Sequence, residues 1–251
     1  MAGHSKWSKV KRSKGALDTK RGMLFSKFSK EIMIAARMGG GSPQTNHRLR
    51  AAIQSARAQS MPNENIERAI KKGTGELGGA AVEEMVYEGY APGGVAVIVE
   101  AATDNKNRTA ADMRTIFSKN GGNLGGPGSV SYLFHRKGQV SVPAASAAED
   151  RVLEIILEAG AEEMESDDTH HMILTPGDKL YAVAEALRGA GIEPESQKLT
   201  YIAEMAVTVA EEAPARQVLR LCEALEDNDD VLSVHANFEI SDELLARVQE
   251  P

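Results

Sequence analysis

Residues 83–119 read EEMVYEGYAPGGVAVIVEAATDNKNRTAADMRTIFSK and contain two strand patterns followed by a helix pattern. The patterns at residues 83–90 and 94–101 predict two strands, and the second strand includes the apolar run from Val95 to Val99. Residues 107–119 predict a helix, because apolar side chains recur at helical spacing, at Ala110, Met113, Ile116 and Phe117. Two strands and a helix joined by tight turns are typical of an α+β domain.

The same alternation continues to the end of the chain. Strand patterns lie at 130–134, 138–142, 162–166, 170–175, 195–202, 205–210 and 231–239, and helix patterns at 147–159, 177–190 and 214–226. The pattern predicts two small α+β sandwiches, each a sheet covered on one face by two helices. Periodicity alone leaves open whether the two follow one another or one is inserted in the other.

The N-terminal part predicts helices only, at 17–38, 45–59 and 62–72, which indicates a small helical bundle. Glycines then mark a linker at 73–79. On the first helix, one side is apolar, with Leu24, Phe25, Phe28, Ile32, Ala35 and Ala36. The other side carries four cations, Lys20, Lys27, Lys30 and Arg37, and we expect it to face a ligand.

Charge is divided unevenly along the chain. The formal net charge is −7, but residues 1–75 carry 16 Lys and Arg against 4 Asp and Glu, a net charge of +12. Residues 76–251 carry 13 Lys and Arg against 32 Asp and Glu, a net charge of −19. A basic segment attached to an acidic body indicates a polyanionic partner for the basic end.

The first fifteen residues hold the densest group of candidate contacts. Cations surround the only tryptophan, Trp7, at Lys6, Lys9, Lys11, Arg12 and Lys14. Because cations neutralise phosphates and an aromatic ring stacks on a base, this arm predicts nucleic-acid binding. The alternative is a solvated charge run whose tryptophan folds back on the helices. The arm has no apolar periodicity, so we expect it to be flexible in the free protein.

A second candidate anion site lies between a predicted strand and helix, at Asn105, Lys106, Asn107 and Arg108. Either asparagine can cap the helix, whose first N–H groups, with the two cations, suit a phosphate. An asparagine-rich turn with solvated charges is the alternative. Arg136 and Lys137 are placed in a hairpin turn before Gly138, where we expect no ligand.

Catalytic and cofactor motifs are missing from the sequence. Residues 73–78 match the dinucleotide fingerprint in letters, but they follow a helix and place Glu76 where a pyrophosphate would lie. His170 and His171 are neighbours on a predicted strand and so point to opposite faces. Cys222 is the only cysteine, which excludes a disulfide framework and a cysteine-based zinc site. We expect no enzyme activity, cofactor, metal or small-molecule substrate.

Membrane and export signals are also missing. No apolar run approaches the roughly 18 residues that a membrane span needs. The basic start has too few apolar residues to form one face of a transit helix. We therefore expect a cytoplasmic protein without a cleaved leader.

Several stretches together resemble the YebC family, which also includes the mitochondrial translational activator of cytochrome c oxidase subunit I. They are MAGHSKW at 1–7, FSKF at 25–28, AARMGG at 35–40, MPNENI at 61–66, YEGY at 87–90, TDNKNRT at 103–109 and GSVSYLF at 128–134. The resemblance implies an N-terminal helical domain at 1–78 and a middle α+β domain formed by 79–128 and 203–240. It also implies an α+β domain inserted at 129–202, and it leaves 241–251 as a tail.

Family members are described as transcriptional regulators that bind DNA, and others resemble translation factors that act on the ribosome. The resemblance thus implies a non-enzymatic regulator that binds DNA, with the arm residues as its contacts. The alternative is a ribosome-associated factor that contacts rRNA or tRNA through the arm and relieves stalling at proline-rich stretches. Two hypotheses from other classes of function are also open. One is an enzyme that acts on RNA or a nucleotide in an interdomain cleft, and the other is an adaptor whose acidic domains bind a basic protein.

Overall fold

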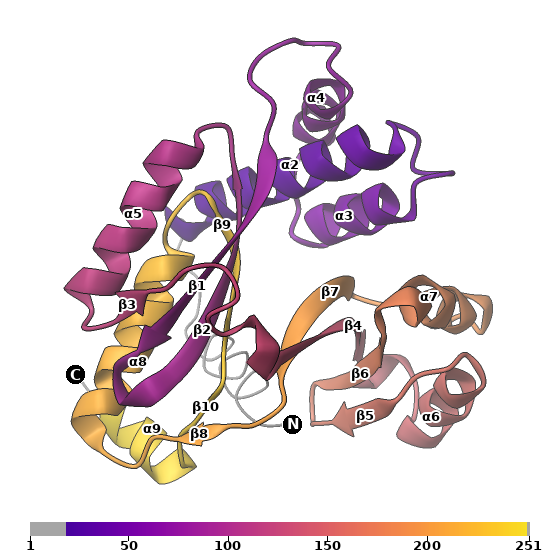
Figure 1. Ribbon diagram of the computed structural model, residues 1–251. Coiled ribbons are helices and arrows are strands. Elements are labelled where there is room, and N and C mark those ends of the chain that lie inside the picture. The colour runs from indigo at the N-terminus through magenta and orange to yellow at the C-terminus, as the bar shows by residue number, and fades with distance from the viewer. Residues whose placement is uncertain (1–18, 250–251) are drawn as a thin grey trace. The chain divides into compact units, whose positions relative to one another are not determined.

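The computed structural model describes residues 19–249, which form two compact units (Figure 1). In the described range, the first unit comprises residues 19–34, 78–135 and 202–249, and the second comprises 35–77 and 136–201. Within residues 19–249, no helix combines the length and the apolar composition needed to cross a bilayer.

The first unit is built on a four-stranded antiparallel sheet. Its order is β3 (Asn123–Leu124), β1 (Glu83–Ala91), β2 (Val95–Thr103) and β9 (Val231–Ala236). A short turn at Pro92–Gly94 joins β1 to β2, and Gly93 and Gly94 adopt positive φ angles of 79° and 75° there. Glycine adopts such angles without strain, so the hairpin follows from the local sequence.

Helices cover one face of this sheet. α5 (Lys106–Lys119) and α8 (Glu212–Glu226) contact each other and lie side by side against the strands (Figure 1). The core between them is fully buried at Val97, Val99, Phe117, Leu221 and Val231. Burial of each such side chain contributes about 1.5–3 kcal/mol, which fixes the two helices on the sheet.

The end of the first unit differs from the sequence prediction. The strand expected at 231–239 is interrupted at Asn237, whose side chain accepts the Ala96 N–H and donates to the Met205 carbonyl. Beyond the break, β10 (Phe238–Glu239) pairs in parallel with β8 (Val207–Thr208). The expected tail contains a helix, α9 (Asp242–Gln249), because Leu244 and Val248 pack into the same core.

The N-terminal helices are α2 (Thr19–Gly39), α3 (His47–Ala58) and α4 (Asn63–Gly73). The division between the two compact units falls within α2, after Ile34. Asn46 organises the next connection: its side chain caps α3 by accepting the Leu49 N–H and donates to the Ala35 and Gly40 carbonyls at the end of α2. The boundaries of the three predicted domains stay a prediction.

The second unit contains the other sheet, in the order β5 (Glu163–Ser166), β6 (His170–Pro176), β4 (Phe134–Pro143) and β7 (Ser196–Ala203). α6 (Glu149–Glu158) and α7 (Leu180–Gly189) pack on it through a core that includes Val140, Ile156, Ile173 and Leu187. These strands lie in the chain between β3 and β8. The predicted fold class is therefore confirmed: an α+β multidomain protein in which the second sandwich is inserted in the first.

The hairpin expected around Arg136 and Lys137 was a wrong prediction. Residues 131–133 form a short 3-10 turn, and β4 then runs without a break through both cations. Gly138 lies inside β4, where a Cβ would lie 2.3 Å from Thr175 Oγ1 on the neighbouring strand. The glycine therefore permits close packing inside the sheet. Lys137 instead forms an ion pair with Glu162 at 2.7 Å.

Candidate nucleic-acid interface

The predicted arm contacts lie outside the described residues. They are Lys6, Trp7, Lys9, Lys11, Arg12 and Lys14, which precede residue 19. Lys20 lies in the first turn of α2, but its side chain also lies outside what the structure describes. The other predicted cations of α2 and the second anion site can be placed.

The cations in the middle of α2 turn inward, toward the body of the first unit. Lys27 donates to the Glu226 carbonyl, and Lys30 donates to the Asp229 carbonyl at 2.7 Å. Glu226 ends α8, where unpaired carbonyls give the helix end a partial negative charge that attracts cations. The exposed cationic stripe expected on α2 therefore includes Arg37, which is exposed, but loses Lys27 and Lys30 to contacts within the fold.

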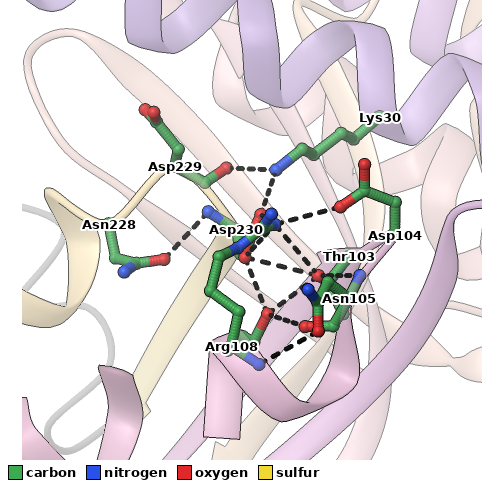
Figure 2. Close-up of polar contacts among 9 residues, drawn as sticks. Lys30, Thr103, Asp104, Asn105, Arg108, Asn228, Asp229 and Asp230 are labelled. Atoms are coloured by element: carbon green, nitrogen blue, oxygen red, sulfur yellow. Dashed lines mark hydrogen bonds and ion pairs between the residues drawn. The ribbon is translucent and has the colours of Figure 1, made fainter. Parts of the chain in front are cut away.

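Lys30 also reaches Asp230, the centre of a buried polar cluster (Figure 2). The Asp230 carboxylate is 2.6 Å from Lys30 Nζ and 2.9 Å from an Arg108 nitrogen. It also accepts the Thr109 hydroxyl at 2.7 Å and the Thr103 hydroxyl at 3.3 Å. One carboxylate thus joins α2, the end of β2 and the start of α5.

Asp230 is held as a carboxylate. The residue is 5% exposed, and this burial, the largest single influence, raises its pKa. The donors Lys30, Thr109 and Arg108 outweigh it and lower the pKa to about 2. Its main chain is fixed as well, because the Asp230 carbonyl accepts the Ala102 N–H at 2.7 Å.

The second predicted anion site is adjacent to this cluster. Asn105 caps α5 as expected, accepting the Arg108 N–H at 3.1 Å. Lys106 pairs with Glu83 at 2.8 Å, and Arg108 contacts Asp104 as well as Asp230. Asn107 is exposed. Both cations thus have carboxylate partners within the fold, and the anion at the start of α5 is the chain's own Asp230.

A second internal carboxylate organises the glycine-rich segment before β4. Glu88 is 7% exposed and accepts three backbone N–H groups, from Gly128, Val130 and Ser131, each at 2.8 Å. Burial raises its pKa, but the three N–H donors outweigh that effect and the net pKa lies below the ordinary value. Like Asp230, Glu88 occupies a site whose donors would otherwise suit an external anion.

Three exposed cations of the N-terminal helices were missed in the sequence. Arg57 lies at the end of α3, and Lys71 and Lys72 lie in the last turn of α4. Their side chains have no hydrogen-bond or ion-pair partner in the range 19–249. All three belong to the second unit, where they contribute positive charge at the surface.

The adjacent histidines on β6 have separate partners. His170 contacts Glu195 at 2.7 Å, whereas His171 is buried and contacts Ser166 and the Ala147 carbonyl. No group of three or more potential metal ligands occurs among the residues that the structure describes.

Family models match nearly the whole chain. Residues 5–76 match the TACO1/YebC protein N-terminal domain, and residues 82–238 match the TACO1/YebC second and third domain. This chain belongs to the TACO1/YebC family. The match extends over the arm, the α2 cations, Glu88 and Asp230.

Relatives of the TACO1/YebC chain are similar over their full length. A protein of Syntrophobacter fumaroxidans is 51% identical over 99% of this chain and 100% of its own length. One of Rubrobacter xylanophilus is 53% identical over 99% of both chains. Each is named "Probable transcriptional regulatory protein". The crystal structure of a conserved hypothetical protein from Aquifex aeolicus superposes with a TM-score of 0.85, at 50% identity, over 91% of this chain and 94% of that one.

Sequence reasoning missed Asp230 and Glu88, the two residues that organise this TACO1/YebC structure locally. The position of Glu88 could have been recognised from the sequence, because it lies in a half-buried strand, where an acidic side chain needs a partner inside the protein. Asp230 carries none: it lies in the acidic run Asp227–Asp230, which is typical of a solvated loop.

Proposed function

We propose that this TACO1/YebC chain is a non-enzymatic, cytoplasmic regulator of gene expression that binds DNA through its basic N-terminal segment. The observation that carries the proposal is the charge division, +12 over residues 1–75 and −19 over the remainder. A polyanion is attracted to the first part and repelled by the second. The names of the relatives support a regulatory role.

The contacts are assigned to the predicted arm residues and to cations of the N-terminal helices. They comprise the predicted arm residues Lys6, Trp7, Lys9, Lys11, Arg12 and Lys14, with Lys20 and Arg37 of α2 and the newly found Arg57, Lys71 and Lys72. Lys27 and Lys30 contribute less than the helix pattern predicts, because each is hydrogen-bonded within the first unit. Contacts of this kind are made with phosphates and carry little base specificity.

The ribosome is the second candidate partner, and the acidic body favours it. A duplex that wraps around the protein would approach the surface that carries the −19 charge. A basic arm with one tryptophan can instead enter folded rRNA while the body stays outside. In this alternative the chain is a translation factor that relieves stalling at proline-rich stretches.

The test compares two variants with the same loss of charge. One replaces Lys6, Lys9, Lys11 and Arg12 with alanine, and the other replaces four exposed cations of the acidic body, Arg114, Lys119, Lys179 and Arg220. Binding to a DNA duplex and to purified bacterial ribosomes is measured over a series of salt concentrations. We expect only the arm variant to bind more weakly and with a shallower salt dependence.

Two outcomes would overturn parts of the proposal. If both variants behave like the wild type, the basic arm is not the contact. If the wild type sediments with ribosomes in low-salt lysate and has no preference for DNA, the ribosome is the partner and the DNA assignment is wrong.

A further inference from the structure

Helix α6, which packs beside α7, has apolar side chains on two sides, and only one of these sides is covered (Figure 1). Val152 and Ile156 are buried in the core of the second unit, and Ile155 packs against that core. Leu153 and Leu157 each follow one of the buried residues and lie one turn apart on the helix surface. Their exposed fractions are 38% and 58%. The apolar surface of α6 is therefore wider than the face that its own sheet covers.

A row of carboxylates borders the two exposed leucines. Asp150, Glu154 and Glu158 recur at four-residue spacing, so they form one line along the helix beside Leu153 and Leu157. All three are exposed, and none of their side chains has a hydrogen-bond or ion-pair partner within residues 19–249. Like charges at this spacing repel each other and destabilise the helix. A row of cations opposite them would remove that repulsion.

The last turn of α6 also lacks a cation. Cations stabilise a helix end, where unpaired carbonyls carry partial negative charge, and every other α-helix of the described range except α8 has a basic residue there. α8 receives one from α2, because Lys27 donates to the Glu226 carbonyl. α6 ends instead at Glu158. The methylene groups of Lys179 lie close to Gly160, but the Lys179 side chain has no hydrogen-bond or ion-pair partner within residues 19–249.

We propose that a cationic amphipathic helix of a partner protein binds the α6 face, which is formed by Asp150, Leu153, Glu154, Leu157 and Glu158. The apolar side chains of the partner cover the two leucines, and its lysines or arginines pair with the carboxylate row and the end of α6. The face is small, so the contact is a transient one. The inference goes beyond the proposed function and does not rest on it, because none of these residues belongs to the assigned nucleic-acid contact.

Charge favours this occupant over the others. Residues 76–251, which include α6, carry a net charge of −19. Nucleic acid and anionic lipid headgroups have the same sign and are repelled from the α6 face. A second copy that placed its own α6 face against this one would bring identical carboxylates together, which costs affinity. A cationic protein segment has the complementary sign and supplies the apolar side chains that the leucines need.

The experiment compares two variants of the α6 face with two matched controls, all in the full chain. The first variant replaces Leu153 and Leu157 with serine. Its control replaces Leu77 and Met205 with serine, because these side chains are also apolar and exposed, at 54% and 72%. Substitutions at exposed positions have little effect on stability, so the fold is expected to persist in both.

The second variant converts the carboxylate row to amides, with Asp150→Asn, Glu154→Gln and Glu158→Gln. Its control removes the same charge from three exposed side chains of the first unit that have no partner within residues 19–249, with Asp227→Asn, Glu239→Gln and Glu243→Gln. The two variants thus separate the apolar part of the contact from the charged part.

The probe is a fluorescent peptide of about 18 residues, made only of leucine and lysine and ordered so that the leucines line one face of a helix. A second peptide has the same composition in scrambled order. Binding is measured by fluorescence anisotropy over a series of salt concentrations. Hydrogen exchange of the α6 amides, with and without peptide, shows where the peptide binds.

We expect the wild type to bind the amphipathic peptide more tightly than the scrambled one, and its α6 amides to exchange more slowly in the complex. The leucine variant should bind about tenfold more weakly with an unchanged salt dependence, because it loses apolar contact only. The carboxylate variant should bind more weakly and with a shallower salt dependence. Both controls should stay within about twofold of the wild type, since distant charges are screened.

Three results would overturn the inference. Equal binding by the wild type and the leucine variant would mean that the peptide responds to charge alone. Equal losses in the carboxylate variant and its control would mean that only net charge matters. A wild-type dimer in sedimentation that the leucine variant dissociates would make a second copy the occupant of the α6 face.

The same measurements keep this inference separate from the proposed function. If the wild type binds the amphipathic peptide through α6 but binds neither DNA nor ribosomes, the proposed function is wrong and the α6 assignment stands. If the wild type binds DNA or ribosomes through its basic segment but does not bind the peptide, the α6 assignment is wrong and the proposed function stands.

Discussion

Replacing Glu88 with glutamine tests whether an internal carboxylate holds the glycine-rich segment before β4. The change keeps the size of the side chain and removes its charge. In the wild type, Oε1 accepts the Gly128 N–H, and Oε2 accepts the Val130 and Ser131 N–H groups. Glutamine has one oxygen, so its NH2 group must face at least one backbone donor.

The cost follows from the number and burial of these donors. Hydrogen bonds to a charged group contribute about 1.5–3 kcal/mol each, and a buried donor left unpaired costs about 1–3 kcal/mol. Val130 is fully buried, whereas Gly128 is exposed and Ser131 is half-buried, so these two can turn to water. We therefore expect Glu88→Gln to lower the free energy of unfolding by about 2–3 kcal/mol.

The effect has a definite pH dependence. Because the pKa of Glu88 is lowered in the folded protein, the unfolded state binds more protons as the pH falls below the ordinary carboxylate pKa. The stabilisation is complete above that ordinary pKa and is lost as the pH falls through the lowered folded value. The difference between wild type and Glu88→Gln should accordingly shrink on acidification.

Urea unfolding followed by circular dichroism, at neutral and at acidic pH, measures both effects. Glu239→Gln is the matched control, because Glu239 is an exposed strand glutamate of the same unit. Its effect should stay within about 0.5 kcal/mol. A loss below about 0.5 kcal/mol for Glu88→Gln at neutral pH, or a loss that grows in acid, would refute the assigned role.

Three further predictions concern local packing. Asn46→Ala removes a helix cap and two contacts to the end of α2, and should lower the free energy of unfolding by about 2 kcal/mol in urea titrations. Asn46→Asp keeps the cap and should lower the free energy of unfolding by less. Gly138→Ala places a methyl group 2.3 Å from Thr175 Oγ1, so it should lower the urea midpoint and reduce the free energy of unfolding by about 1–3 kcal/mol. Gly189→Ala is the control, because the space around Gly189 is open and the urea midpoint should not fall. Cys222 is fully buried and its pKa is raised by burial and by Glu226, so a thiol reagent should label it only after unfolding; rapid labelling of the native protein would contradict this placement.

The local elements were predictable from short-range patterns. The helix at 107–119 was placed within one residue of α5, because its asparagine cap and apolar spacing are both encoded within a few residues. The β1–β2 hairpin was equally clear from two apolar strands around a proline and two glycines. α9 was missed, since its apolar spacing covers only two turns and depends on the core for stability.

The candidate site also has features that the sequence predicts and contacts that it does not. The sequence identified the charge division and the α5 cap, which are properties of neighbouring residues. It did not reveal that Lys27 binds the end of α8 and Lys30 the loop that follows, because those partners lie 199 or 200 residues away along the chain. A lysine on a polar helix face has the same pattern whether it meets phosphate or an internal carboxylate.

By itself, the sequence determined the fold class, most helices and strands, the basic segment and the family resemblance, since each rests on local periodicity, composition or linear motifs. Only the tertiary structure decided which charges are available. Asp230 has the sequence neighbours of a solvated acid, yet in the fold four donors from distant segments surround it. Electrostatic interaction depends on distance in space and on burial, and neither can be read from the order of residues.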